Sequence, residues 1–509
     1  MSAEEAARAA APHLREATHN LGVLYLQLYA NPPVLGKGKM VVLHVWLKRL
    51  APSNDIGHTL PHQQRHAVHG FAWAEDPEHL NSSSDGGNWR MAFDDLSVWQ
   101  PQLRLLTSMG EVVAAESALD QLPDAPHINA PVRPYHFSFP LNQTLPGRCF
   151  KVYEASFPGQ LVGLCLPPPA PRLCTRLART PTHSPSAPAL WSLVFPVRRV
   201  MGVNDSNWEQ HARQALNRIS SHASYIVGMG GGGIVLYIDR MLRTILERHP
   251  RLALLAAEGR LVLVPWELPE RRDLHATYDL ALVAAHALLG LSACGANLAL
   301  LVSDLDELPY SPHGRPWRDV FTCMAADAAR QAAASSAPGP GLFQLRRVDV
   351  LSSRLAPAEE AAWWSRPGPA LQLASGGAAA AINAAAARRQ RAAALLRHPI
   401  LAYDRLKRWP HSPGLEKILA IPARRVVGMY VHDGFPLYGS VHVANASCAF
   451  MLHLPNYWGV RHAGGAAALE AEFTPFRLVV PGSQRERKRG TRVGSAAGRV
   501  AAGGNGTGQ

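Results

Sequence analysis

Three carboxylates follow an apolar run in the middle of the chain. Residues 298–310 read LALLVSDLDELPY, and the acidic residues in this stretch are Asp304, Asp306 and Glu307. In an extended segment Asp304 and Asp306 point the same way, because side chains alternate with a period of two. Two carboxylates on one side repel each other unless a cation lies between them. The spacing therefore indicates a cation site.

The chemistry of these residues suits Mg²⁺ or Mn²⁺, which prefer hard oxygen ligands and leave further coordination positions to waters and substrate phosphates. A metal held in this way neutralises a diphosphate leaving group. The alternative is a solvated acidic turn in which Asp304 caps a helix, since isolated D-x-D sequences are common.

The surrounding residues predict the elements that position the acidic triplet. Apolar runs and helical periodicity alternate along this part of the chain. This order is typical of a parallel α/β sheet, in which ligands bind at the carboxyl ends of the strands. Asp304 lies at such an end. The predicted strands span 190–197, 233–239, 261–266 and 298–303, and the predicted helices span 205–227, 241–249 and 280–295.

Composition changes along the chain predict three regions. Residues 1–190 form a β-rich region of unknown role, with short apolar runs between turn residues. Residues 191–480 form the α/β domain. They include an Ala-rich insertion at about 326–400, which we expect to be partly disordered around the segment LFQLRRVDVLSS. Residues 481–509 form a basic, disordered tail, because they are rich in Arg, Gly and Ala without apolar periodicity.

The order of these segments resembles glycosyltransferase family 92. Members of the family have a strand that ends in Tyr-Asp, a strand that ends in Pro-Trp, and a strand that runs into a D-x-D-E-F motif. A later Lys segment and a late His also resemble the family, although Leu308 replaces its usual Phe and Leu454 its usual Tyr. The matching residues are Tyr237, Asp239, Pro265, Trp266, Asp304, Asp306, Glu307, Lys417, His432 and His453.

The resemblance covers residues 195–325 and 412–460. It implies an α/β fold of the GT-A type, which transfers sugars from nucleotide diphosphates. The implied activity is inverting transfer of a hexose, galactose, from a UDP-sugar to a glycan acceptor with Mn²⁺ or Mg²⁺.

The resemblance also implies roles for individual residues. Tyr237, Asp239, Asp304 and Lys417 bind the nucleotide sugar, with Lys417 on the diphosphate. Asp304, Asp306 and His453 hold the metal. Inversion needs a general base that deprotonates the acceptor hydroxyl, and Glu307 and Asp433 are the two candidates.

Charge and hydropathy limit the classes of protein that fit. The net charge is +13, yet six of the basic residues fall within residues 485–499 of the tail. Basic and aromatic residues do not interleave elsewhere, so we predict no nucleic-acid partner.

No apolar run reaches the length of roughly 18 residues that a membrane span needs. The N-terminus lacks the apolar segment of a signal peptide. The Golgi or other endomembrane location that the resemblance implies therefore requires an anchor not visible in this chain.

The six cysteines are scattered and form no C-x-x-C pairs. This pattern argues against a structural zinc site and against a disulfide scaffold. It leaves room for one or two bridges, with Cys149, Cys165 and Cys174 as the closest group. N-x-S/T triplets permit N-glycosylation in a secretory compartment, and they begin at Asn81, Asn142, Asn204, Asn445 and Asn505.

Two further motifs have ordinary explanations. The sequence GMGGGG at 228–233 fits G-x-G-x-x-G, but it precedes a predicted strand instead of following one, so it is not typical of a dinucleotide site. His58, His62, His66 and His69 have helical spacing but lack an H-E-x-x-H arrangement, which favours a surface cluster. The chain has neither a G-x-S-x-G motif nor a P-loop, so hydrolase and NTPase activities lack support.

The rival hypothesis is a non-catalytic carbohydrate-binding or scaffold protein with a degenerate α/β domain. The two hypotheses make different predictions about geometry. The enzyme needs the Asp304 and Asp306 carboxylates to open into a cleft beside Asp239, with His453 close enough to bind the same metal ion.

Overall fold

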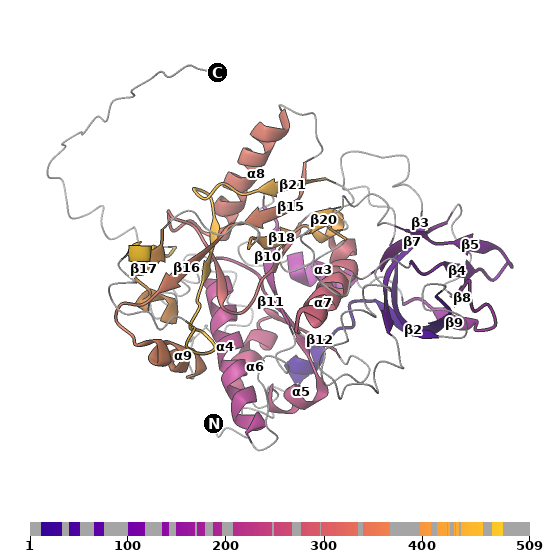
Figure 1. Ribbon diagram of the computed structural model, residues 1–509, viewed down its shortest axis with the longest axis horizontal. Coiled ribbons are helices and arrows are strands. Elements are labelled where there is room, and N and C mark those ends of the chain that lie inside the picture. Colours follow the sequence, from indigo (N-terminus) through magenta and orange to yellow (C-terminus); the bar gives the residue numbers. More distant parts are fainter. Residues whose placement is uncertain are drawn as a thin grey trace.

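The computed structural model is a mixed α/β protein with several sheets (Figure 1). It describes residues 12–32, 40–50, 66–75, 100–117, 135–141, 149–167, 171–178, 187–195, 207–246, 249–266, 276–295, 297–333, 339–366, 398–408, 415–424, 426–427, 432, 434–436, 439–461 and 471–481. The predicted basic tail lies outside the described residues, except for position 481.

The N-terminal region contains two antiparallel sheets that share one core. In the five-stranded sheet the order is β1 (Leu24–Ala30), β2 (Val41–Leu50), β3 (His66–Glu75), β7 (Tyr135–Leu141) and β6 (Glu116–Ser117). In the four-stranded sheet it is β5 (Val112–Ala114), β4 (Leu103–Leu106), β8 (Cys149–Glu154) and β9 (Val162–Cys165). Apolar side chains of both sheets pack together, as in a β-sandwich. His66 and His69 lie on β3, a strand and not a helix, and His58 and His62 lie outside the described residues.

The central sheet has seven strands, in the order β12 (Leu261–Pro265), β11 (Gly233–Ile238), β10 (Ala189–Val194), β13 (Leu298–Val302), β18 (Lys417–Ala420), β15 (Pro340–Leu345) and β21 (Ser440–Val443). The first four strands are parallel. β18 is antiparallel to both of its neighbours, and β21 is parallel to β15. β10 to β13 carry almost uninterrupted buried side chains, as expected for parallel strands covered on both faces.

Helices cover both faces of the central sheet. On one face, side chains of α4 (Trp208–Gly228), α5 (Arg240–Leu246), α6 (Pro250–Ala257) and α8 (Trp317–Ala333) pack against alternate strand residues such as Leu236. On the other face, α3 (Pro171–Ala178) and α7 (Ala276–Leu291) pack against the intervening residues such as Tyr237. The period of two within each strand thus separates two layers of core. Helix α9 spans Pro357–Ser365, and short 3-10 helices span Ser292–Cys294, Pro399–Ala402 and Pro422–Arg424.

A third sheet of five strands continues from the end of the central one. Its order is β14 (Glu307–Tyr310), β22 (Phe450–His453), β16 (Arg347–Leu351), β17 (Arg405–Lys407) and β23 (Phe473–Pro475). A separate short pair consists of β19 (Val426–Val427) and β20 (Phe435–Pro436). Because β13 and β14 are separated by four residues, the acidic stretch forms the connection between the two sheets.

Part of the predicted insertion at 326–400 forms regular secondary structure. Residues 326–333 complete helix α8, and residues 340–351 form β15 and β16. β15 lies inside the central sheet, between β18 and β21. The segment LFQLRRVDVLSS, which the sequence singled out as the element of this stretch, forms most of these two strands. Its Ala-rich and Arg-rich surroundings gave no sign that β15 belongs to the central sheet.

Gly233 explains why the glycine-rich segment at 228–233 leads into a strand. A Cβ at this position would lie 1.9 Å from the backbone oxygen of Arg260, so only glycine lets β11 approach the start of β12 so closely. The segment is a helix-to-strand connection between α4 and β11, as its order along the chain predicts.

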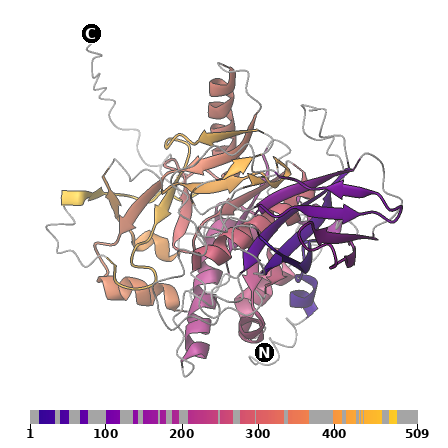
Figure 2. The ribbon, with the colours of Figure 1, turned by 45° about the vertical axis from the view of Figure 1, so that its right-hand side comes forward.

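The β-sandwich packs on the α/β domain through sheet β1–β2–β3–β7–β6, and Figure 2 shows it coming forward on the right. Trp46 of β2 stacks on Trp266, with ring centroids 5.8 Å apart. The buried ammonium of Lys48 donates to the backbone oxygens of Leu21 and Gly290, the latter at the end of α7. Burial lowers the pKa of Lys48 to about 8.

All six cysteines form disulfides: Cys149–Cys165, Cys174–Cys294 and Cys323–Cys448. The sequence-based prediction of one or two bridges is wrong, because partners more than 100 residues apart come together only in the folded chain. Cys174 pairs with Cys294 and not with the nearby Cys149 or Cys165. Three disulfides indicate an extracellular or lumenal protein. Among the described residues, no helix combines the length and the hydropathy needed to cross a bilayer.

Candidate metal centre

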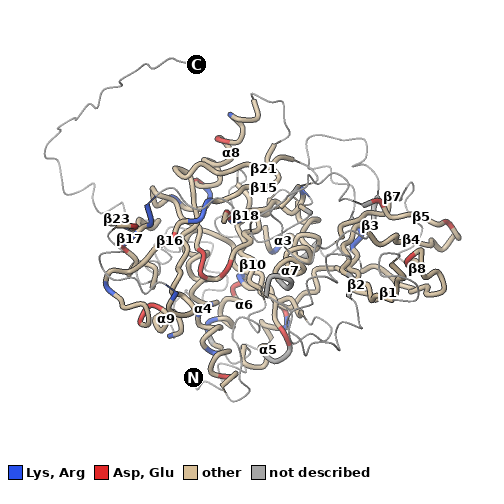
Figure 3. The backbone as a smooth tube through the Cα atoms, in the orientation of Figure 1, with Lys and Arg blue, Asp and Glu red and all other residues tan. Residues whose placement is uncertain are grey.

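The acidic turn between β13 and β14 is closed by its own carboxylate. The backbone N–H of Glu307 donates to the backbone oxygen of Asp304 over 3.1 Å. In return, the N–H of Asp304 donates to Oε2 of Glu307 over 3.0 Å. These two bonds fix the backbone of the turn, so its carboxylates are positioned before any ligand binds. Figure 3 shows acidic segments between β16 and β10, with basic segments close by.

Strand register brings late residues of the chain against this turn. Glu307 of β14 pairs with His453 of β22, and His453 pairs in turn with Asp349 of β16. Residues directly opposite each other on neighbouring strands have adjacent side chains. Three residues separated by as many as 146 positions in sequence (307 to 453) therefore meet at one place.

The imidazole of His453 bridges two carboxylates. Its Nδ1 lies 2.7 Å from Oδ1 of Asp349, and its Nε2 lies 3.8 Å from Oδ2 of Asp306. With Nδ1 hydrogen-bonded to Asp349, the other ring nitrogen, Nε2, is directed at Asp306. Histidines that bind metals are commonly oriented by a carboxylate in this way. Burial opposes ionisation of Asp349, but the His453 hydrogen bond and the nearby charges of Arg347 and Lys407 keep its pKa below the ordinary value.

The structure supports a direct prediction for Asp349. Replacing it by Asn removes the charge that fixes the ring, so we expect Mn²⁺ affinity to fall about 10- to 100-fold while the fold is retained. Isothermal titration calorimetry measures the affinity, and Asp319→Asn, an exposed carboxylate on α8, is the control for loss of one negative charge. An Asp349→Asn protein that binds Mn²⁺ as tightly as the control would show that His453 is not a ligand.

Asp306, Glu307 and His453 can hold one metal ion. Each offers one ligand atom, and these atoms all lie within 4.8 Å of one another. Ligands on an ion with bonds of roughly 2.1 Å are about 3 Å apart when adjacent and about 4.2 Å apart when opposite. The 3.8 Å between Asp306 and His453 lies inside this range, whereas the 4.8 Å limit on the whole group exceeds it, so the side chains must move closer together to bind one ion. Oε1 of Glu307 is buried, accepts no hydrogen bond and lies 3.5 Å from the guanidinium of Arg347. The donor set therefore fits a divalent cation such as Mn²⁺.

Asp306 has fewer positively charged partners than Glu307, the other carboxylate of the group. Its side chain is 7% exposed, and in the described part of the chain its ion-pair partner is His453. Burial raises the pKa of Asp306 to about 7, with further contributions from the negative charges of Asp304 and Glu307. His453 and Arg461 act in the opposite direction. A divalent cation beside Asp306 would stabilise its ionised form and lower this pKa.

This pKa predicts how metal binding depends on pH. Mn²⁺ binds the ionised carboxylate, so protons compete with the metal wherever Asp306 is protonated. We expect the association constant to rise up to tenfold per pH unit below about pH 7 and to level off above about pH 8. Calorimetric titrations across this range measure the slope. In a His453→Gln variant the slope should persist, because its source is Asp306. An affinity that is independent of pH between about 5.5 and 8 would contradict the assignment.

Lys417 neutralises two carboxylates of the turn. Its Nζ lies 3.0 Å from Oδ2 of Asp304 and 3.0 Å from Oε2 of Glu307, and its side chain is 1% exposed. Burial alone would lower the pKa of Lys417, but the charges of Glu307 and Asp304 outweigh it and raise the pKa. The expected role of Lys417 on a diphosphate stays a prediction; in this structure its ammonium is paired with the buried Glu307 and the 40% exposed Asp304.

The structure describes one of the two predicted general bases, Glu307. Glu307 is fully buried, and its Oε2 is engaged by Lys417 and the backbone of Asp304. Burial raises the pKa of Glu307, and Lys417 opposes this effect. Contact with an acceptor hydroxyl would require the buried carboxylate of Glu307 to become accessible, and its role as the base stays a prediction. Asp433 lies outside the described residues.

The predicted nucleotide-binding residues are split between core and sheet edge. Tyr237 is fully buried, and its hydroxyl is 2.7 Å from Nδ1 of His286. In this structure it is part of the core, and its expected role in nucleotide binding stays a prediction. Asp239 follows β11 at the carboxyl edge of the sheet, where its Oδ1 caps α5 by accepting from the N–H of Leu242. Two strand spacings, roughly 10 Å, separate this position from the end of β13, because β10 lies between them. Asp304 has a side chain 40% exposed.

Sequence reasoning missed four charged residues around the site: Asp349, Arg347, Lys407 and Arg461. Arg347 lies 3.5 Å from Oε1 of Glu307, and Lys407 lies 3.6 Å from Oδ2 of Asp349. Arg461 is exposed and acts electrostatically on Asp306. The signal for Asp349 was present, since an Asp inside the apolar strand VDVL needs a polar partner.

His432, whose position resembles the family, also lies near the group. Its Nδ1 is 2.9 Å from the backbone oxygen of Glu416. Burial lowers the pKa of His432 to about 4, and the charge of Lys417 contributes to this shift. This ring is therefore neutral at physiological pH.

Comparisons with known proteins yield no match, either among protein families or among curated proteins. The resemblance to glycosyltransferase family 92 therefore stands on the quoted residues alone.

Proposed function

We propose that the protein is an inverting, metal-dependent glycosyltransferase of the GT-A type. It moves a hexose, galactose, from a UDP-sugar to a glycan acceptor. The observation that supports this best is the convergence of Asp306, Glu307 and His453 within 4.8 Å, beside the carboxyl end of β13. Nucleotide ligands of open α/β sheets bind at this edge.

A divalent cation bound here supplies charge neutralisation for the departing diphosphate. Asp306, Glu307 and His453 hold that cation, and Asp349 fixes the tautomer and orientation of the His453 ring. Lys417 keeps Glu307 paired inside the protein. Arg461, which is exposed, adds a positive charge that acts on Asp306.

Inversion requires that the acceptor oxygen attack the anomeric carbon while the bond to the diphosphate breaks and a base removes the hydroxyl proton. Both predicted bases stay predictions: Glu307 is buried and paired with Lys417, and Asp433 lies outside the described residues. The carboxylate of Asp304 is 40% exposed and lies next to the residues that bind the cation. This position suits contact with the UDP-sugar.

The experiment that tests the function is a panel of nucleotide sugars with Mn²⁺, measured as nucleotide diphosphate release with a mixture of oligosaccharide acceptors. We expect turnover of UDP-galactose that EDTA and Asp306→Ala both abolish, with activity restored when Mn²⁺ is added back to the wild type. Asp319→Ala is the matched control and should retain activity.

Other results distinguish the rival hypothesis. Oligosaccharide binding without turnover of any donor would support a non-catalytic carbohydrate-binding protein. Turnover that survives EDTA or Asp306→Ala would refute the metal assignment.

The three disulfides agree with a protein that works on the lumenal side of a membrane compartment. We place it in the Golgi or another endomembrane lumen, where UDP-sugars and glycan acceptors meet.

A further inference from the structure

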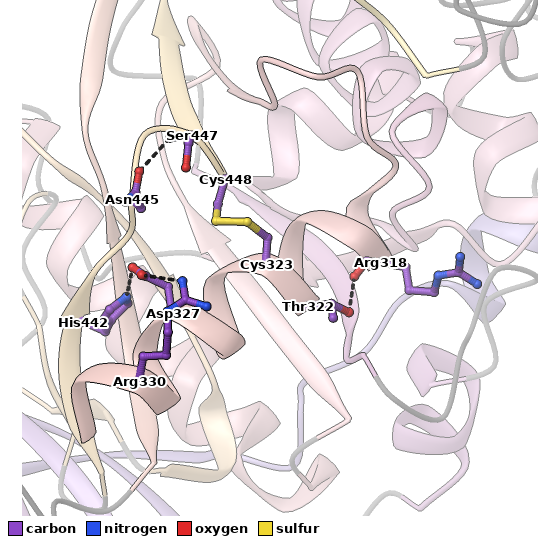
Figure 4. Close-up of a disulfide and its surroundings, with 9 residues drawn as sticks. All are labelled: Arg318, Thr322, Cys323, Asp327, Arg330, His442, Asn445, Ser447 and Cys448. Carbon is purple, nitrogen blue, oxygen red and sulfur yellow. Dashed lines mark hydrogen bonds and ion pairs between the residues drawn. A yellow bond between two sulfur atoms is a disulfide. The ribbon is translucent and has the colours of Figure 1, made fainter. Parts of the chain in front are cut away.

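One N-x-S triplet lies in an exposed turn of the structure. Asn445, Ala446 and Ser447 connect β21 to β22, and both Asn445 and Ser447 are exposed. Oδ1 of Asn445 accepts from the N–H of Ser447 over 2.9 Å, as Figure 4 shows. The Nδ2 atom of Asn445 makes no hydrogen bond with the described part of the chain. This is the atom to which an N-linked sugar attaches.

A disulfide next to this turn indicates the cellular compartment in which the chain matures. Cys448 immediately follows the triplet and forms a disulfide with Cys323 of α8 (Figure 4). A chain that forms three disulfides matures in an oxidising compartment, which in eukaryotic cells also holds the machinery of N-glycosylation. The other four triplets, at Asn81, Asn142, Asn204 and Asn505, lie outside the described residues.

We propose that Asn445 carries an N-linked glycan. In this reaction Nδ2 of Asn445 forms a bond to the anomeric carbon of a lipid-diphosphate oligosaccharide. The bond between that carbon and the diphosphate breaks, the lipid diphosphate leaves, and Nδ2 gives up one proton to a base of the transferring enzyme. The backbone oxygen of Asn445 accepts from the N–H groups of Cys448 and Ala449, so the folded turn is tight. The glycan is therefore added before the disulfide Cys323–Cys448 closes the turn.

The glycan has a structural consequence for the neighbouring strand. β21 is the last strand of the central sheet, and its residues Val441 and Val443 are each 42% exposed. Between them, His442 is buried and lies 3.3 Å from Asp327. An edge strand with exposed apolar side chains is a template for pairing with another chain. A glycan two residues beyond Val443 covers this edge.

Peptide mapping tests the attachment. The full chain is expressed through the secretory pathway of a eukaryotic host and treated with a glycan-releasing amidase in heavy-oxygen water. We expect the peptide that contains Asn445 to appear with a labelled Asp at this position, and Asn445→Gln and Ser447→Ala to abolish the label. Ser447→Thr keeps the triplet and should keep the label. Recovery of only unmodified Asn445 from secreted protein would overturn the proposal.

A second measurement tests the covering of β21. Light scattering should show more self-association for Asn445→Gln and Ser447→Ala than for wild type and Ser447→Thr. Equal self-association of all four proteins would overturn the covering role. A chain that transfers no sugar can still carry this glycan, so the two proposals fail independently.

Discussion

Asp306→Asn is expected to stabilise the metal-free protein and to abolish Mn²⁺ binding. The pKa of Asp306 is raised from 3.8 to about 7, so the folded state binds its proton more tightly than the unfolded state. Stability therefore falls as pH rises from about 4 to about 7, and ionised Asp306 costs about 2–4 kcal/mol above that range. Asparagine removes this cost, because it fills the same volume without charge. Thermal unfolding at about pH 8 in EDTA should show a higher Tm for the variant.

The same comparison at low pH provides an internal control. Below about pH 4 Asp306 is protonated in both states, and the difference in Tm should vanish. Asp304→Asn should not stabilise the protein, because the Asp304 side chain is 40% exposed and paired with Lys417. If Asp306→Asn lowers the Tm at about pH 8, Asp306 is a compensated structural carboxylate and not a site that awaits a cation.

Lys417→Met is expected to destabilise the protein more than any other single change at the site. The substitution leaves Glu307 buried without its ammonium partner, since both Asp304 and Glu307 lie 3.0 Å from Nζ. Breaking a buried ion pair from one side costs about 3–5 kcal/mol. Chemical denaturation at about pH 8 measures the loss, and part of it should be recovered on acidification, as Glu307 takes up a proton.

Lys407→Met is the matched control for this change. Lys407 also faces a carboxylate of the site, Asp349, but across 3.6 Å and with a side chain 36% exposed. Exposed pairs contribute about 0–1 kcal/mol, so we expect little loss. Equal effects of the two substitutions would mean that Lys417 does not neutralise Glu307 in solution.

The sequence predicted the α/β half of the fold well, and the reason is physical. Strands buried on both faces must be apolar throughout, so runs such as GIVLYI and LALLV are recognisable without an alignment. The segments between these runs have the length and the flanking turn residues of helices, which favours an alternating strand and helix order over other folds. The position of Asp304 at the end of a strand followed directly from this pattern.

The partners of the acidic turn could not be predicted in the same way. His453 and Lys417 reached the candidate site only through the family resemblance, and Asp349 was missed. Strand register between β14, β22 and β16 brings these residues together, and register depends on tertiary packing that no local pattern encodes. The ion pairs of Lys417 with Asp304 and Glu307 depend likewise on the antiparallel pairing of β18 with β13.

The disulfides illustrate a related limit. Cys174–Cys294 and Cys323–Cys448 join residues 120 and 125 positions apart. Six cysteines permit many pairings, and their spacing alone does not choose among them.

Pulsed electron paramagnetic resonance of bound Mn²⁺ tests the metal centre most directly, because it detects nitrogen atoms coordinated to the ion. We predict one Mn²⁺ per chain at about pH 8, with coupling to a single imidazole nitrogen that disappears in His453→Gln. Coupling that survives His453→Gln, or Mn²⁺ bound without any nitrogen ligand, would contradict a site formed by Asp306, Glu307 and His453.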